Sequence, residues 1–285
     1  MKRPATSVYL LLLCLTFCQF ASCSSDRPIP QSAEPISADI QSELNKLGYD
    51  VSDFETIPAD NPLTDEIEPG KNFLIGGDMV IRPDQLIEML EAEARHPGVG
   101  NEHYRTCNLV TGLPRTIEVI GMNGGSPALT TKMQTALNWA IYNYNTLNTG
   151  LTFSLTFGTN WPGKDIIVYK VSNGQAGGQA GFPSGGNPYQ FVQIFDGMEN
   201  YNTNVNEHVM THEIGHCLGL RHSDWFDVSF SCGSGGNEGT IGNCAIHIPG
   251  TPTGPDATSV MLACFDANEN GEFGRLDRAA LEFLY

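Results

Sequence analysis

The sequence predicts an α+β fold in which a mixed, mostly parallel, twisted sheet packs against two long helices. Apolar residues recur at helical spacing along residues 129–147 and about 205–218, and a final helix is expected from about 277 to 285. Four further segments have the pattern of strands: residues 115–120, 151–157, 166–171 and 189–195. Because strand, helix, strand and strand follow one another, we expect one sheet covered by the helices and then an irregular C-terminal subdomain.

Acidic residues outnumber basic ones, and much of the excess lies in the first third of the chain. The formal net charge of −17 argues against nucleic acid and against an anionic membrane surface as partners. Residues 24–100 hold 16 of the 32 acidic residues but only five of the 15 Lys and Arg residues. We therefore separate an acidic N-terminal segment, residues 39–100, from the main domain, residues 101–285.

The first 22 residues have the character of a secretory signal peptide. Lys2 and Arg3 precede an apolar run, residues 8–17, that is too short to span a bilayer. The small residues directly before Cys23 resemble a bacterial lipobox, whose cysteine is lipidated after cleavage. We predict an exported lipoprotein tethered to the cell envelope by residues 23–38, with this lipid as its membrane contact. A secreted protein without the lipid and an uncleaved anchor are the alternatives.

Five cysteines remain in the main domain: Cys107, Cys217, Cys232, Cys244 and Cys264. Export places them where disulfides persist, so we expect two bridges and one spare thiol, with the pairing undetermined. A cysteine-bound metal is disfavoured because no C-x-x-C pair occurs.

The second long helix carries an extended metal-binding motif, His212-Glu213-x-x-His216-x-x-Gly219-x-x-His222. Residues four apart share one face of a helix, so His212 and His216 can point at one ion. Glycine tolerates the left-handed conformation that ends a helix, so we expect the chain to turn at Gly219 and bring in His222. The motif predicts three neutral imidazole ligands for one zinc ion, with a fourth position open to water.

Glu213 is rotated by only about 100° from His212 around the helix and can reach a water at that ion. Zinc lowers the pKa of such a water, and Glu213 would take its proton during attack on a carbonyl group. His208 extends the histidine row, but a straight row about 12 Å long cannot surround an ion. We therefore expect His208 to be exposed. We expect His247 to be a loop residue, with a substrate-side role as the alternative.

Residues 212–222 match the signature of the metzincin clan of zinc endopeptidases. Ser259-Val260-Met261 is similar to that clan's Met-turn, whose methionine lies beneath the zinc without binding it. Together with residues 221–225 and 247–252, these motifs most resemble the bacterial HEIGH-type metallopeptidases, and the likeness covers about residues 104–285. The resemblance implies a metzincin-like catalytic domain that acts on proteins or peptides, with Met261 as the Met-turn residue.

The same resemblance assigns zinc to His212, His216 and His222 and the role of general base to Glu213. One departure concerns transition-state stabilisation. Some metzincins place a tyrosine two residues after the Met-turn methionine, whereas this chain has Ala263. Another donor must then help the zinc to stabilise the oxyanion.

Within the acidic segment, Ile75-Gly-Gly-Asp78-Met79 resembles the pro-segment motif with which astacin-like metzincins block their zinc. The hypothesis is that Asp78 occupies the water position until the segment is cut near residues 96–100. The alternative is a Gly-Gly hairpin turn with an ordinary exposed aspartate. In both cases residues 71–82 are expected to form two short strands around the turn.

Two further segments leave alternatives open. Residues 174–187 are a surface loop, or residues 178–181 form the edge strand on which a substrate peptide pairs through its backbone. Near the C-terminus the spacing is that of a calcium loop, although Asp277 fits a helix cap equally well. The residues with this spacing are Asp266, Asn268, Asn270 and Asp277.

These observations favour a zinc endopeptidase that is expected to be monomeric. The alternative is an inactive zinc-containing surface lipoprotein that acts as a binding module. Glu213 favours the enzyme, because a structural zinc site has no use for a base and usually fills its fourth position.

Overall fold

The computed structural model describes residues 54–58, 63, 71–82, 85, 103–238, 245–251 and 254–285, all within a compact unit that spans residues 33–285. The predicted signal peptide, the lipidated Cys23, the tether and nearly all of the acidic segment before residue 71 lie outside the described residues. The same is true of the predicted cleavage region, residues 96–100. No helix in the described ranges is long and apolar enough to cross a membrane.

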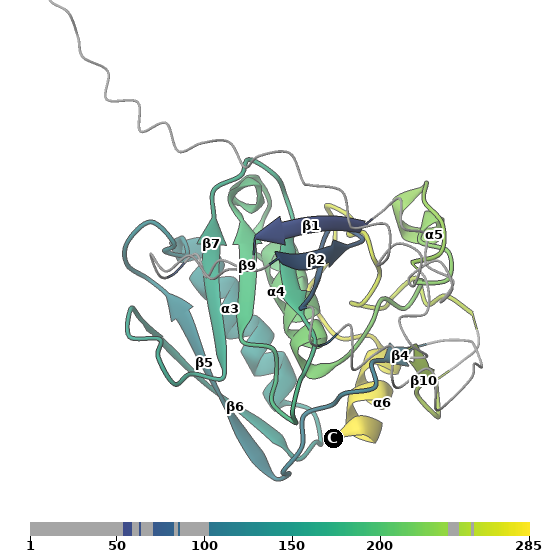
Figure 1. Ribbon diagram of the computed structural model, residues 1–285. Coiled ribbons are helices and arrows are strands. Elements are labelled where there is room, and N and C mark those ends of the chain that lie inside the picture. The colour runs from purple at the N-terminus through teal and green to yellow at the C-terminus, as the bar shows by residue number, and fades with distance from the viewer. Residues whose placement is uncertain are drawn as a thin grey trace, which may run out of the picture. The chain divides into compact units, whose positions relative to one another are not determined.

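An eight-stranded sheet runs through the molecule in the order β1-β2-β3-β8-β9-β7-β5-β6 (Figure 1). The pairs β5–β6, β5–β7, β7–β9 and β3–β8 are parallel, and the other three are antiparallel. The prediction of an α+β fold with a mixed, mostly parallel sheet is therefore confirmed. The strands are β1 (Phe54–Pro58), β2 (Lys71–Ile75), β3 (Met79–Ile81), β5 (Arg115–Met122), β6 (Leu151–Gly158), β7 (Ile166–Val171), β8 (Gly178–Gly181) and β9 (Phe191–Phe195).

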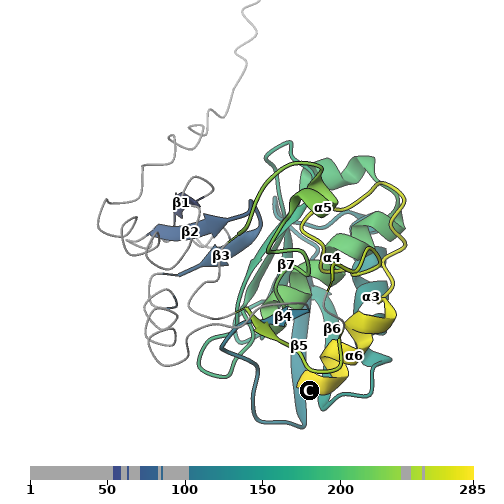
Figure 2. The ribbon, with the colours of Figure 1, turned by 90° about the vertical axis from the view of Figure 1, so that its right-hand side faces the viewer.

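Two long helices, α3 (Thr131–Asn145) and α4 (Thr203–Leu218), pack on one face of this sheet (Figure 2). The side chain of Thr130 caps α3 by accepting from Met133 N. Apolar side chains of both helices and of β5, β6, β7 and β9 form one buried core. The Tyr144 hydroxyl of α3 donates to the carbonyl of Thr211 at 2.8 Å and so ties α3 to the helix that carries the motif.

The C-terminal part is mostly irregular, as predicted. It contains the one-turn helix α5 (Ser229–Cys232), the strand β10 (Ile246–His247), which pairs with β4 (Tyr104–Arg105), and the final helix α6 (Arg275–Leu284). A disulfide joins Cys232 to Cys264, Cys107 is also disulfide-bonded, and Cys217 is a buried free thiol. Among the described cysteines this agrees with two bridges and one spare thiol.

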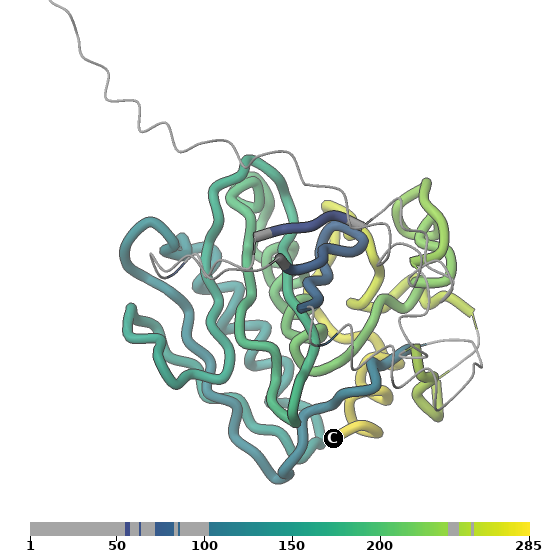
Figure 3. Tube along the Cα trace, viewed as in Figure 1, coloured from purple at the N-terminus to yellow at the C-terminus, as the bar shows by residue number. Residues whose placement is uncertain are grey.

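Strand β8 confirms that residues 178–181 form a strand, but β8 does not lie at the sheet edge. Strand β3 pairs with it in parallel, Met79 opposite Ala180 and Val80 opposite Gly181. The expectation of an edge strand is wrong for this form because residues 71–82, which form the predicted hairpin, extend the sheet by two strands. Figure 3 shows these purple segments beside the green ones that follow much later in the sequence.

Candidate metal centre

Helix α4 ends two residues after His216, the second histidine of the motif. The Asn202 side chain caps its first turn by accepting from Val205 N, and Gly219 ends it with φ of 102°. A Cβ at Gly219 would lie 2.9 Å from the carbonyl oxygen of Asn108, so space as well as backbone conformation requires glycine. The turn brings His222 back toward the histidine face of the helix, as predicted from the motif.

The two histidines on α4 are oriented by backbone carbonyls. His212 Nδ1 lies 2.9 Å from the carbonyl oxygen of Val260, and His216 Nδ1 lies 2.8 Å from that of Leu220. Because a carbonyl can only accept, each Nδ1 carries the proton and each Nε2 keeps its lone pair. The two Nε2 atoms are thus prepared as ligands.

His222 is oriented by a carboxylate instead. Its Nδ1 lies 2.5 Å from Glu238 Oε1, and Glu238 Oε2 lies 3.5 Å from Nη2 of the buried Arg221. Sequence reasoning missed Glu238, because it lies 16 residues further along in an irregular segment with no motif around it. The one available signal was an acidic residue in a Gly-rich loop, which is not specific.

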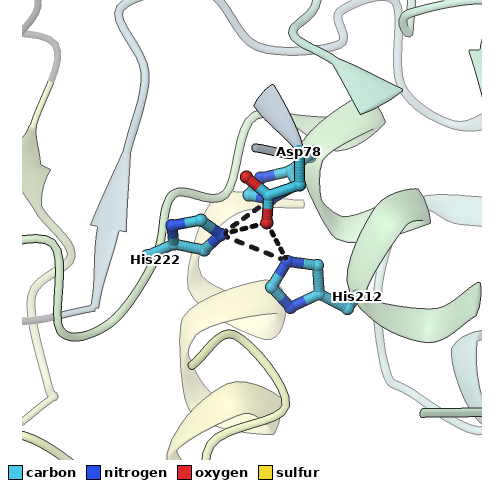
Figure 4. A group of neighbouring side chains, drawn as sticks. Asp78, His212 and His222 are labelled. Carbon is cyan, nitrogen blue, oxygen red and sulfur yellow. Dashed lines mark hydrogen bonds and ion pairs between the residues drawn. The ribbon is translucent and has the colours of Figure 1, made fainter. Parts of the chain in front are cut away.

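The three ligand nitrogens converge on one point, and Figure 4 shows two of the rings, His212 and His222, turned toward Asp78. His222 Nε2 lies 3.2 Å from His212 Nε2 and 3.2 Å from His216 Nε2. Four donors around a tetrahedral zinc with bonds of about 2.0–2.1 Å would lie roughly 3.3–3.4 Å apart, close to these separations. Three lone pairs turned toward one another repel unless a cation lies between them, so the residues fit a metal ion.

Asp78 supplies a fourth donor from the N-terminal hairpin. Its Oδ2 lies 2.9 Å from His222 Nε2 and 3.5 Å from His212 Nε2, and its side chain is only 13% exposed. Donor atoms of Asp78, His212, His216 and His222 all lie within 4.8 Å of one another, and no second such group occurs among the described residues. The alternative of an ordinary exposed aspartate is therefore wrong.

Burial and neighbouring charges shift the pKa of three groups at this centre. Burial would lower the pKa of His222, but Asp78 and Glu238 beside it raise it well above its ordinary value. Burial would raise the pKa of Asp78, but His222 and His212 hold it far below. Burial and the neighbouring His212 and His222 lower the pKa of His216.

Glu213 is fully buried beside the histidines. Its Oε2 has no hydrogen-bond partner among the described residues, and burial together with Asp78 raises its pKa well above the ordinary value. A Cβ at Gly178 would lie 2.7 Å from Glu213 Oε1, so the glycine on β8 makes room for the carboxylate. A cavity of about 290 Å³ opens beside it, between Gly178 and the side chains of Phe195, Val209 and Phe265.

Met261 lies buried against helix α4. A Cβ at Gly215 would be 2.6 Å from the Met261 sulfur, so this glycine allows the methionine to approach the helix between the two histidine turns. The Met261 carbonyl accepts from Ser223 N at 2.7 Å and thereby holds the segment that follows His222. The role of Met261 as a Met-turn residue stays a prediction.

Asp277 anchors the segment before Met261. Its Oδ1 accepts from Ser259 Oγ at 2.7 Å and lies 3.0 Å from His103 Nε2, while Oδ2 accepts from Val260 N and from Gly274 N. Asp277 therefore caps the start of α6 by accepting from the backbone N–H of the N-cap residue Gly274, and a helix cap was the alternative to a calcium ligand. The calcium ligands Asp266, Asn268 and Asn270 stay a prediction; they bond within their own turns.

The two remaining histidines have different outcomes. His208 was expected to be exposed, and this is wrong: its side chain is 5% exposed, because residues after Met261 fold over the first turns of α4. Burial and the nearby His212 lower its pKa to about 3. His247 was expected in a loop, but it lies in the two-residue strand β10, opposite Tyr104, and its Nε2 lies 3.3 Å from the Thr251 hydroxyl.

Comparison with known proteins gives one family. Residues 73–285, about three quarters of the chain, match the model of the dual-action HEIGH metallo-peptidases. No curated protein matches.

Similar solved structures include two of myroilysin, with TM-scores of 0.40 and 0.38, identities of 12% and 15%, and coverage of 62% and 63% of this chain and 82% and 89% of theirs. Metalloproteinase-II from Bacteroides fragilis has a TM-score of 0.33, 12% identity and 75% coverage of both chains. The family model alone spans most of this chain, its metal centre included, and the chain therefore belongs to the dual-action HEIGH metallo-peptidases.

Proposed function

We propose that this chain is a zinc endopeptidase that uses Glu213 as its general base and is kept latent by Asp78. The observation that carries the proposal is the convergence of three ligand nitrogens beside the buried Glu213, whose Oε2 has no hydrogen-bond partner in the part of the chain that the structure describes. When bound, zinc supplies Lewis acidity, which acidifies its water and polarises the substrate carbonyl.

Glu213 would move the proton of the reaction. Its carboxylate takes a proton from the attacking water and delivers it to the amide nitrogen as the peptide bond breaks. Water is consumed, and a carboxylic acid and an amine are released. The position of Glu213 between His212 and strand β8 supports this role, because a peptide paired along β8 would pass directly over the carboxylate.

Latency rests on the N-terminal hairpin. Strand β3 pairs with β8, where a substrate backbone would lie, and the Asp78 carbonyl accepts from Ala180 N at 3.0 Å. The Asp78 carboxylate lies among the ligand nitrogens, where it would exclude the reacting water. A cut after this hairpin would free both positions together.

Digestion of casein by the purified protein tests the peptidase function, with and without a chelator and alongside Glu213→Ala. We expect activity to depend on both the metal and Glu213. Casein hydrolysis that is insensitive to both would contradict the proposal.

N-terminal sequencing of the active form tests latency separately. We expect its first residue to lie beyond Asp78. Full activity of a chain in which residues 24–100 are still covalently attached would contradict latency and leave the peptidase assignment intact.

A further inference from the structure

The three ligand histidines differ in what holds their Nδ1 atoms. Two of them donate to backbone carbonyls, which no substitution can remove. The third, His222, donates to the Glu238 carboxylate at 2.5 Å. It is also the ligand that lies outside helix α4, beyond the turn at Gly219, where no regular element fixes its position.

Glu238 is itself held firmly. Its side chain is 6% exposed, its backbone N–H donates to the Trp225 carbonyl at 2.8 Å, and its second carboxylate oxygen faces Arg221. The Arg221 guanidinium lies over the Trp225 ring, 5.4 Å from the ring centre. The carboxylate therefore has a fixed direction and a nearby cation before any metal binds.

We propose that Glu238 is a positioning residue for the metal, acting through His222. By accepting from Nδ1 it fixes the tautomer in which Nε2 faces the metal site and holds the imidazole plane in place, and its negative charge makes the ring a stronger donor to the metal. This inference rests on the metal-binding part of the proposed function, not on peptide hydrolysis. Glu238 contacts Nδ1 of His222 and not the Nε2 atom that would bind the metal, so it is not a catalytic residue.

The test is the zinc dissociation constant of the full chain, measured by competition with a chromophoric chelator near pH 7. Removal of such an acceptor typically weakens metal binding by about 10- to 100-fold, which we expect for Glu238→Ala. Glu238→Gln keeps the volume and one acceptor oxygen but lacks the charge, so we expect a smaller loss. Glu282→Gln, an exposed carboxylate on α6, is the matched control and should bind zinc like the wild type.

A merely structural role would give a different pattern. Both Glu238 variants would then unfold more easily in the metal-free state but bind zinc with the wild-type dissociation constant, and this result would overturn the proposal. If Glu238→Ala does not fold, Glu238→Gln decides alone: a weaker zinc affinity supports the role and an unchanged affinity refutes it. Because zinc binding is read directly, a failure to hydrolyse casein would count against the proposed function only.

Discussion

The sheet differs on the two sides of strand β8: the inner flank consists of β9, β7, β5 and β6 with the helices that cover them, and the outer flank consists of β3, β2 and β1. On the inner flank, β5 pairs with β6 through eight residues and β7 with β9 through five, under a cover of helices. Strand β8 itself joins each flank through two residue pairs, with β9 on the inner side and with β3 on the outer side. Strand β3 is nevertheless fully buried, so its attachment depends on apolar contact more than on backbone hydrogen bonds.

In the proposed mechanism, the groups that bind metal and move the proton lie on one flank, and the group that inhibits them lies on the other. All three histidines and Glu213 belong to the inner flank, on α4 and the segment that follows it. Asp78 alone comes from the outer flank. Under the proposed latency, loss of the hairpin would remove the Asp78 carboxylate and leave the three histidine ligands in place. The comparison predicts opposite signs: substitution of a reacting group on the inner flank lowers activity, and a substitution on the outer flank that displaces the Asp78 carboxylate raises it.

The largest effect is expected for Glu213→Ala, on the inner flank. A positioned general base contributes roughly 10²- to 10⁴-fold to a rate, so kcat on a peptide substrate should fall by about that factor. The measurement is kcat of the processed form, together with its zinc content. Zinc content should not change, because the ligands are untouched. An unchanged kcat at full zinc occupancy would contradict the role of Glu213 as general base.

Asp277→Asn should give the second largest effect, on stability. Burial would raise the pKa of Asp277, but His103 and the donors around it hold the pKa below its ordinary value. Asparagine keeps one acceptor oxygen for His103 but places an NH2 group against the N–H groups of Val260 and Gly274. Two buried donors without an acceptor should lower the free energy of unfolding by about 3 kcal/mol, measured by urea denaturation.

The pH dependence provides the control for Asp277. A lowered pKa gives stability that is present above the unfolded value near 4 and is lost as pH falls through the folded value. The wild type should therefore lose this advantage over Asp277→Asn in acid. A constant difference between the two proteins down to pH 2 would show that the carboxylate charge is not what stabilises the turn.

The inner flank could be predicted from the sequence because its signals are local. Helical periodicity located α3 and α4, and the motif with Gly219 predicted how His222 reaches the other histidines. What escaped prediction depends on contacts between distant segments. Glu238 is recognised only where its loop meets His222, and the burial of His208 depends on the residues after Met261.

The outer flank shows the same limit. The two strands around Gly76 and Gly77 were predicted from their pattern, and Asp78 only by resemblance to a pro-segment motif. The pairing of β3 with β8 could not be predicted, because two strands about 100 residues apart that pair in parallel have no local sequence pattern in common. The expected edge strand was wrong for this reason.

Asp78→Ala should raise the activity of the uncut chain. It removes the carboxylate from the ligand nitrogens but leaves β3 paired with β8, so we expect a gain of roughly tenfold, equivalent to a shift of about 1.4 kcal/mol. Glu55→Gln, an exposed change on β1, is the matched control and should stay latent. Equal activities of the two variants, measured before any cleavage, would contradict control by the outer flank.

The smallest expected effect compares the two glycines of the hairpin turn. Gly76 and Gly77 both have positive φ, of 62° and 86°, so alanine at either position carries a similar backbone strain of about 1–2 kcal/mol. Only at Gly76 does a Cβ meet another group, Glu238 Oε1 at 3.2 Å. This contact would push the hairpin away from the carboxylate that holds His222.

We therefore expect uncut Gly76→Ala to be several-fold more active than uncut Gly77→Ala, since about 1 kcal/mol changes a population roughly fivefold. Activity should be measured together with zinc affinity, because movement of Glu238 instead of the hairpin would weaken zinc binding. Higher activity of Gly76→Ala with an unchanged zinc affinity would show that the hairpin has moved and Glu238 has not. Equal activity in the two variants would mean that the hairpin is held by the apolar contacts of β3 alone and that Glu238 takes no part in latency.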